Sequence, residues 1–69
     1  MKRYEFRIAE RDGQSRVLAS HIAANDVAAL IEARRYCEHH PVEIWEGTRW
    51  VARLQRGVAE EAPETRSRL

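Results

Sequence analysis

Residues 42–54 constrain the fold more than any other part of this chain. Apolar and polar residues alternate on both sides of Gly47, which is the pattern of two short strands joined by a tight turn. Both tryptophans of the sequence, Trp45 and Trp50, lie in this segment. Because successive side chains of a strand point to opposite faces of a sheet, the turn between the two indoles decides which face each one occupies.

A three-residue loop over residues 46–48 predicts the two faces of this hairpin. The face toward the rest of the fold then carries Val42, Ile44, Trp50, Ala52 and Leu54. The opposite, outer face carries Glu43, Trp45, Arg49, Val51 and Arg53. A loop with one residue more or fewer changes the cross-strand partners and exchanges the faces, so the register stays open at this point. Trp45 and Trp50 share one face only if the number of loop residues is even.

The beginning of the chain predicts another hairpin. Apolar residues alternate with charged ones in a period of two, which places on one core-facing side Tyr4, Phe6 and Ile8. Residues 11–14 supply a turn that contains a glycine. Residues 17–22 predict the return strand. Its inward side chains stay open between two sets, Leu18 with Ile22 or Val17 with Ala19.

A helix is expected after this hairpin. Asn25 is a favoured N-cap residue, and Asp26 suits the positive end of the helix dipole. Spacings of three and four predict one buried stripe, with an arginine interrupting it, made of Val27, Leu30, Ile31, Arg34 and Cys37. We expect His39 and His40 to close the helix and Pro41 to stop it.

The elements therefore follow the order β-β-α-β-β. This order predicts an α+β fold with one helix packed on a four-stranded, mainly antiparallel sheet, and it leaves the strand order undetermined. We expect a single domain over residues 1–56. Residues 57–69 are polar, contain a proline and lack a period, so they are expected to form a disordered tail.

Length and composition bound the class of protein. A chain of 69 residues forms one small domain with a thin core, since domains of this size bury only about 60% of their unfolded surface. The one cysteine, Cys37, excludes an intramolecular disulfide and favours a reducing compartment. The first residues lack the apolar run of a signal peptide, and no segment reaches the roughly 18 apolar residues of a membrane span. We expect a soluble, cytoplasmic protein without membrane contact.

Charge argues against a dedicated nucleic-acid binder. The sequence holds 12 basic and 11 acidic residues, and every basic residue except Lys2 is an arginine. Acidic and basic residues are interleaved, so the chain lacks the concentrated basic footprint that attracts phosphate. The arginine excess is attributed to codon usage in a GC-rich genome rather than to a guanidinium-rich binding surface.

No residue pattern predicts catalysis or a cofactor. Cys37 and His40 could supply two ligands to zinc, but a structural site needs about four, and no second pair has a recognisable spacing. Cys37 lies late in the expected helix, away from the helix N-terminus that lowers a thiol pKa. The glycines are isolated, and paired carboxylates lie in the tail or near a turn. We therefore predict neither enzyme activity, nor a cofactor, nor a metal site.

The outer face of the sheet is the remaining candidate for function. Its interface candidates are Trp45, Arg49, Val51, Arg53 and Arg7. Tryptophan and arginine are enriched among residues that dominate binding energy. Three interpretations compete: a purely structural cation–π pair, a homodimer or protein-binding surface, and a platform that stacks on single-stranded bases. We expect a non-catalytic interaction module, a homodimer or a binder of another protein, with single-stranded nucleic acid as the alternative.

The hairpin also carries a resemblance to a family. Short alphaproteobacterial proteins end in the pattern Glu-[Ile/Leu/Val]-Trp-x-Gly-x-Arg-x-Val-Ala-Arg-Leu, and residues 43–54 of this chain are similar to it. Further matching residues are Tyr4, Phe6, Asp12, Gly13, Asn25, Asp26, Ala28, Ala29, Ala33 and Arg34. Residues 20–24 and Pro41 depart from the family. The resemblance implies the fold over residues 4–54, and it implies no activity, cofactor or catalytic residue.

Overall fold

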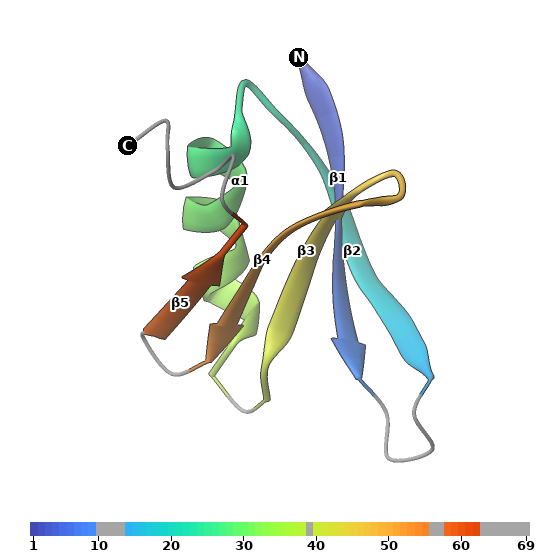
Figure 1. The fold of residues 1–69 in the computed structure, drawn as a ribbon, viewed down its shortest axis with the longest axis vertical. Coiled ribbons are helices and arrows are strands. Elements are labelled where there is room, and N and C mark those ends of the chain that lie inside the picture. Colours follow the sequence, from blue (N-terminus) through green and yellow to red (C-terminus); the bar gives the residue numbers. More distant parts are fainter. Residues whose placement is uncertain (10–13, 39, 56–57, 63–69) are drawn as a thin grey trace.

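A five-stranded antiparallel sheet with one α-helix across one face makes up the described chain (Figure 1). The computed structural model describes residues 1–9, 14–38, 40–55 and 58–62. The strands lie in the order β2-β1-β3-β4-β5. The elements are β1 (Lys2–Ala9), β2 (Ser15–Ala23), α1 (Asp26–Ala33), a 3₁₀ turn (Arg34–Tyr36), β3 (Val42–Glu46), β4 (Arg49–Gln55) and β5 (Val58–Glu61). The predicted α+β class is confirmed, and all four strand pairs are antiparallel.

The fifth strand corrects two predictions, the four-stranded sheet and the disordered tail over residues 57–69. β5 lies inside the segment that was expected to be a disordered tail, and it pairs with the edge of β4. Ala62, directly after it, is 4% exposed and donates its backbone N–H to the carbonyl of Val51 at 2.9 Å. Pairing satisfies backbone groups of β4, a gain that composition does not reveal. Residues 63–69 of the expected tail lie outside the described residues.

The core lies between α1 and the sheet face that it covers. The predicted inward residues of β1 are confirmed, since Tyr4 and Phe6 are fully buried and Ile8 is 7% exposed. The other buried apolar residues around them are Ala23, Ala29, Leu30, Ala33, Cys37, Val42, Ile44, Val51, Ala52 and Leu54. Alanines on the helix side let its backbone approach the aromatic residues of the sheet closely.

A β-bulge in β2 settles the register that the sequence left open. Phe6 lies opposite Ala19, and the next residue of β1, Arg7, lies opposite Val17, so Leu18 is the extra residue. Leu18 and Ala19 both pack against the core, although they are neighbours in sequence. Neither predicted set is therefore correct as a whole, because a bulge reverses the alternation of side chains along a strand.

The helix begins as predicted and ends earlier. Asn25 caps it, because its Oδ1 accepts a hydrogen bond from the backbone N–H of Ala28 at 2.9 Å. α1 ends at Ala33 and tightens into the 3₁₀ turn, so the prediction that His39 and His40 close the helix is wrong. His40 lies in a bend beyond the helix, and His39 is outside the described residues.

The buried face of the helix also differs from the predicted stripe. Leu30 and Cys37 of the predicted stripe are buried, which confirms that part of the prediction, but Ile31 is 57% exposed, and Ala29 and Ala33, which were not predicted, are fully buried. The rotation follows from size, because the helix turns its small residues toward the sheet and brings the backbone close. Asp26 shares this buried side, although it is charged.

Candidate interaction face

The hairpin of β3 and β4 places both tryptophans on the same side of the sheet. Its loop has two residues, Gly47 and Thr48, and Gly47 has a φ of 60°, which glycine adopts at little cost. Trp45 therefore lies directly opposite Trp50. The prediction that Trp50 faces the helix is wrong, because the loop is even in length rather than three residues long.

A bulge at Val51 completes the change of register. Ile44 pairs with Ala52 while Trp45 pairs with Trp50, so Val51 is the extra residue of β4. Val51 and Ala52 are both fully buried. Val51 was predicted on the outer face, and that prediction is wrong, since the bulge turns its side chain into the core.

Arg49 likewise belongs to the inner side of the hairpin. It pairs with Glu46 next to the loop and reaches the buried carboxylate of Asp26. The expectation that Arg49 lies on the outer face is therefore corrected. The other three interface candidates, Trp45, Arg53 and Arg7, do share the outer face, because their strand partners Glu43 and Glu5 lie on it as well.

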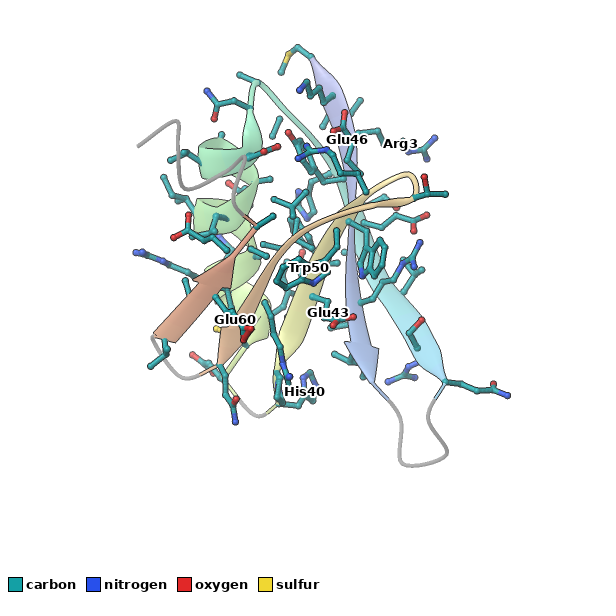
Figure 2. All side chains as sticks on the ribbon, in the orientation of Figure 1. Arg3, His40, Glu43, Glu46, Trp50 and Glu60 are labelled. Carbon is teal, nitrogen blue, oxygen red and sulfur yellow. The ribbon has the colours of Figure 1, made fainter. Side chains whose placement is uncertain are left out.

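Trp45 lies on β3, the middle strand of the sheet, and Trp50 lies opposite it on β4; Figure 2 shows Trp50 on this face. Both are half-buried. The Arg7 guanidinium lies 5.0 Å from the centre of the Trp45 ring, in cation–π contact, and Trp45 Nε1 donates a hydrogen bond to Glu43 at 3.3 Å. Trp45 is thus held in place from β1 and from its own strand.

Each arginine near the tryptophans has a carboxylate beside it. Arg7 Nε donates to Glu5 at 3.0 Å, and Arg53 lies between Glu43 on β3 and Glu60 on β5. The strand pairings place three arginines and three glutamates on the described outer face: Arg3, Arg7, Arg53, Glu5, Glu43 and Glu60. The face is therefore neutral overall, although it is densely charged.

Exposed aliphatic residues extend the face to both edges of the sheet. On β2, Val17 is 48% exposed and lies opposite Arg7, and Ile22 is 68% exposed and lies opposite Arg3. On β5, Val58 is 70% exposed. No helix or strand of the described residues covers this face, whereas α1 covers the other one (Figure 1).

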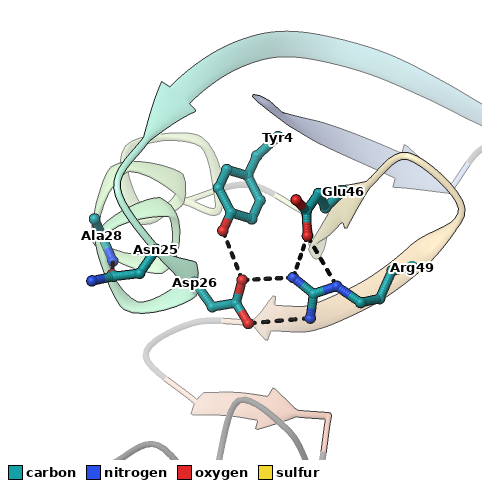
Figure 3. A network of polar contacts seen from close by, with 6 residues as sticks. All are labelled: Tyr4, Asn25, Asp26, Ala28, Glu46 and Arg49. Atoms are coloured by element: carbon teal, nitrogen blue, oxygen red, sulfur yellow. Dashed lines mark hydrogen bonds and ion pairs between the residues drawn. The ribbon is translucent and has the colours of Figure 1, made fainter. Parts of the chain in front are cut away.

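A polar network lies on the inner side of the same hairpin tip (Figure 3). Asp26 is 1% exposed, and its Oδ1 accepts hydrogen bonds from the Tyr4 hydroxyl and from Arg49 Nη2, both at 2.7 Å. Arg49 Nη1 donates to Asp26 Oδ2 at 3.2 Å, so the ion pair is bidentate. Arg49 Nε also donates to Glu46 at 3.0 Å. We call these four residues the Asp26 network.

The Asp26 network joins four elements, β1, α1, β3 and β4, and shifts the pKa of two of its members. Burial, together with the hydrogen bond to Asp26, raises the pKa of the Tyr4 hydroxyl above its usual value. Hydrogen bonds to Asp26 and Glu46 raise the pKa of the Arg49 guanidinium, which stays charged. The sequence indicated only a helix-dipole role for Asp26. In the sequence, the only signs of this network were Arg49, which lies beside the hairpin loop, and Tyr4, whose hydroxyl lies on a core-facing position and needs a partner.

The remaining polar side chains form no second site among the described residues. His21 Nε2 and the Tyr36 hydroxyl lie 2.9 Å apart, and His21 stacks on Phe6 with ring centres 4.9 Å apart. The Cys37 thiol is buried and donates to the carbonyl of Arg34. Within the described ranges, no group of three histidine, cysteine or acidic side chains is placed to hold a metal ion, and no helix is long and apolar enough to cross a membrane.

Comparison with known proteins adds no relative. No family of known proteins, no curated protein and no solved structure matches this chain.

Proposed function

We propose that this protein is a non-catalytic interaction module that forms a homodimer through the outer face around Trp45. The observation that carries the proposal is the pair of half-buried indoles, Trp45 opposite Trp50, in the middle of a face that no described element covers. Aromatic residues of this kind, central on a surface, dominate binding energy in protein interfaces. The cytoplasmic location stays a prediction.

Charge favours a second copy as the partner. The outer face carries equal numbers of arginines and glutamates, and they alternate between neighbouring strands. Two such faces do not repel each other, and each arginine of one copy can find a glutamate of the other. Sheets that pack face to face keep their strands within about 30° of each other, which suits two copies of one twisted sheet.

The size of the face is also adequate. The molecule measures 33 by 22 Å along its two longer axes, the plane of Figure 1. A face of these dimensions is of the order of the ~800 Å² that each partner buries in a standard stable interface. A second copy would also cover Trp45 and add buried apolar surface, which stabilises a chain with so small a core.

Light scattering on a sizing column, before and after substitution, tests the proposal. Trp45→Ala should weaken self-association by roughly 30-fold, because central aromatic residues contribute about 2 kcal/mol or more. Ile31→Ala is the matched control, since Ile31 is 57% exposed on the helix, away from this face. A wild-type monomer at high micromolar concentration, with tryptophan emission unchanged by dilution, would refute the homodimer.

Single-stranded nucleic acid is the alternative partner, and the observation that favours it is the Arg7 guanidinium stacked on Trp45. The carboxylates beside the arginines argue against it, because they repel phosphate. Oligonucleotide titration of tryptophan fluorescence at low and high salt separates the two functions. Tryptophan quenching that occurs at low salt and disappears at high salt would favour nucleic acid. Tryptophan emission that does not change at low salt would exclude it.

A further inference from the structure

The two edges of the sheet differ in how well they are protected from another strand. β5 has four residues, and two of them are glutamates. β2 has nine residues, and no strand of the described chain pairs with its outer side (Figure 1). Natural proteins usually protect such edges with charges, prolines, bulges or short strands. β5 is short and charged, so it follows this rule.

β2 lacks most of these protections. Residues 17–25 contain neither a proline nor any acidic residue, lysine or arginine, and no other uncharged stretch of this chain is as long. One third of the whole sequence is charged, so this gap is unusual. The bulge at Leu18 disturbs only the first half of the strand. Residues 19–23 then run as a regular strand with an open backbone edge.

We propose that this edge pairs with β2 of a second copy, antiparallel, so that two sheets join into one continuous sheet. The inference rests on the proposed function only in taking a second copy as the partner, and it uses a different surface. Backbone N–H and C=O groups on the free side of β2 supply the hydrogen bonds, as in other cases of strand addition. The contact leaves both outer faces accessible.

The alternation of side chains fits a two-fold axis at the middle of residues 19–23. In β2, Ala19, His21 and Ala23 lie opposite Phe6, Tyr4 and Lys2 on the helix side, while Ser20 and Ile22 lie opposite Glu5 and Arg3 on the outer side. Antiparallel pairing of these five residues with themselves keeps like faces together. Ala19 then lies opposite the partner's Ala23, and Ser20 lies opposite the partner's Ile22.

This pairing meets little steric or electrostatic resistance. Its cross-strand pairs are Ala19 with the partner's Ala23, Ser20 with the partner's Ile22 and, on the axis itself, His21 with the partner's His21, so no arginine, lysine, aspartate or glutamate meets a like charge across the axis. Ile22, which is 68% exposed in the single copy, lies opposite the partner's Ser20 and diagonal to the partner's Ile22 on the joined outer face. The contact is isologous, because residues 19–23 of each copy meet the same residues of the other.

A charge placed on the edge tests the contact. Because Ile22 also lies on the outer face, Ile22→Lys is made in the Trp45→Ala background, where the contact between outer faces is already weakened. There it should halve the mass measured by light scattering at about 100 µM relative to Trp45→Ala alone and leave the far-UV circular dichroism unchanged, because lysine on an edge blocks pairing. Ile31→Lys in the same background is the matched control, since it places the same charge at an exposed isoleucine of the helix, and the mass should stay as in Trp45→Ala alone. An unchanged mass in Ile22→Lys, or an equal drop in both variants, overturns the proposal.

Hydrogen exchange on the unmodified chain gives a second measurement that needs no variant. Amides on the free side of residues 19–23 should exchange more slowly as the protein concentration rises from about 10 to about 500 µM, by at least roughly tenfold. Exchange rates independent of concentration overturn the proposal. Trp45→Ala separates the two surfaces, because it should weaken only the contact between faces and leave the concentration dependence in residues 19–23 intact.

Discussion

The two sides of the hairpin tip carry opposite kinds of chemistry. Toward the core lie Glu46 and Arg49, and the Arg49 guanidinium binds both Glu46 and the buried Asp26. Toward the outer face lie Trp45 and Trp50, half-buried and covered by no described element. A chain with a thin core would gain more by burying its largest apolar side chains. This inversion supports the proposal that the indoles belong to a contact surface.

The two sides of the hairpin tip also differ in how much their contacts contribute to stability. The inner side consists of interactions that are expensive to break, because a lost partner leaves a buried charge without compensation. The outer side consists of exposed cation–π and ion-pair contacts, which contribute little to stability on their own. Mutations on the two sides should therefore act on different measurements.

Loss of the carboxylate at the centre of the Asp26 network should have the largest effect. Asp26→Ala leaves the Tyr4 hydroxyl and the Arg49 guanidinium without this acceptor, and we expect a loss of about 3–5 kcal/mol in the free energy of unfolding. Urea denaturation followed by circular dichroism measures it. Glu38→Ala is the control, since Glu38 is exposed beyond the helix and its loss should cost less than about 0.5 kcal/mol. Equal effects of both variants would remove the distinction between the two sides.

Alkaline pH should act on the inner side through Tyr4. Its raised pKa means that the fold favours the protonated hydroxyl, so this contribution is complete below the usual tyrosine pKa of about 10 and is lost as the pH rises through the raised value. We expect the stability of the wild type to fall above about pH 10 by up to about 1.4 kcal/mol per pH unit.

Tyr4→Phe is the comparison that isolates this effect. The variant should lose about 1–2 kcal/mol at neutral pH, because Asp26 loses a hydrogen bond from a buried donor. Above pH 10 its stability should fall less steeply than that of the wild type. Parallel curves of unfolding free energy against pH for the two proteins would show that Tyr4 does not titrate with the fold.

The smallest effect is expected on the outer side. Arg7→Ala removes the guanidinium above the Trp45 ring and its contact with Glu5, and it should cost only about 0.5–1 kcal/mol in stability. Thermal denaturation measures this loss, and the emission spectrum of the tryptophans should shift as the ring becomes more exposed. A loss as large as that of Asp26→Ala would contradict the separation of roles.

Much of the fold and three of the five candidate interface residues were accessible from local pattern, and the other two residues were not. The core face of β1, the N-cap at Asn25 and the existence of the second hairpin follow from spacing within a few residues. Of the candidate interface residues, Trp45, Arg53 and Arg7 lie together as expected, whereas Arg49 and Val51 lie inside. The two-residue loop and the bulge at Val51 decide which face Arg49 and Val51 occupy, and the alternation of apolar and polar residues predicts neither feature.

The sequence by itself determined the types and the order of the first two strands, the helix and the following hairpin, because strand alternation, helix spacing and capping act between neighbouring residues. Only the tertiary structure decided the faces, the fifth strand and the burial of Asp26. These depend on partners distant in the chain: β4 provides the edge that orders β5, and Tyr4 and Arg49 provide the hydrogen bonds that make a buried carboxylate tolerable. A pattern of neighbouring residues does not show which distant residue will be the partner, so it predicts neither the pairing of β5 nor the burial of Asp26.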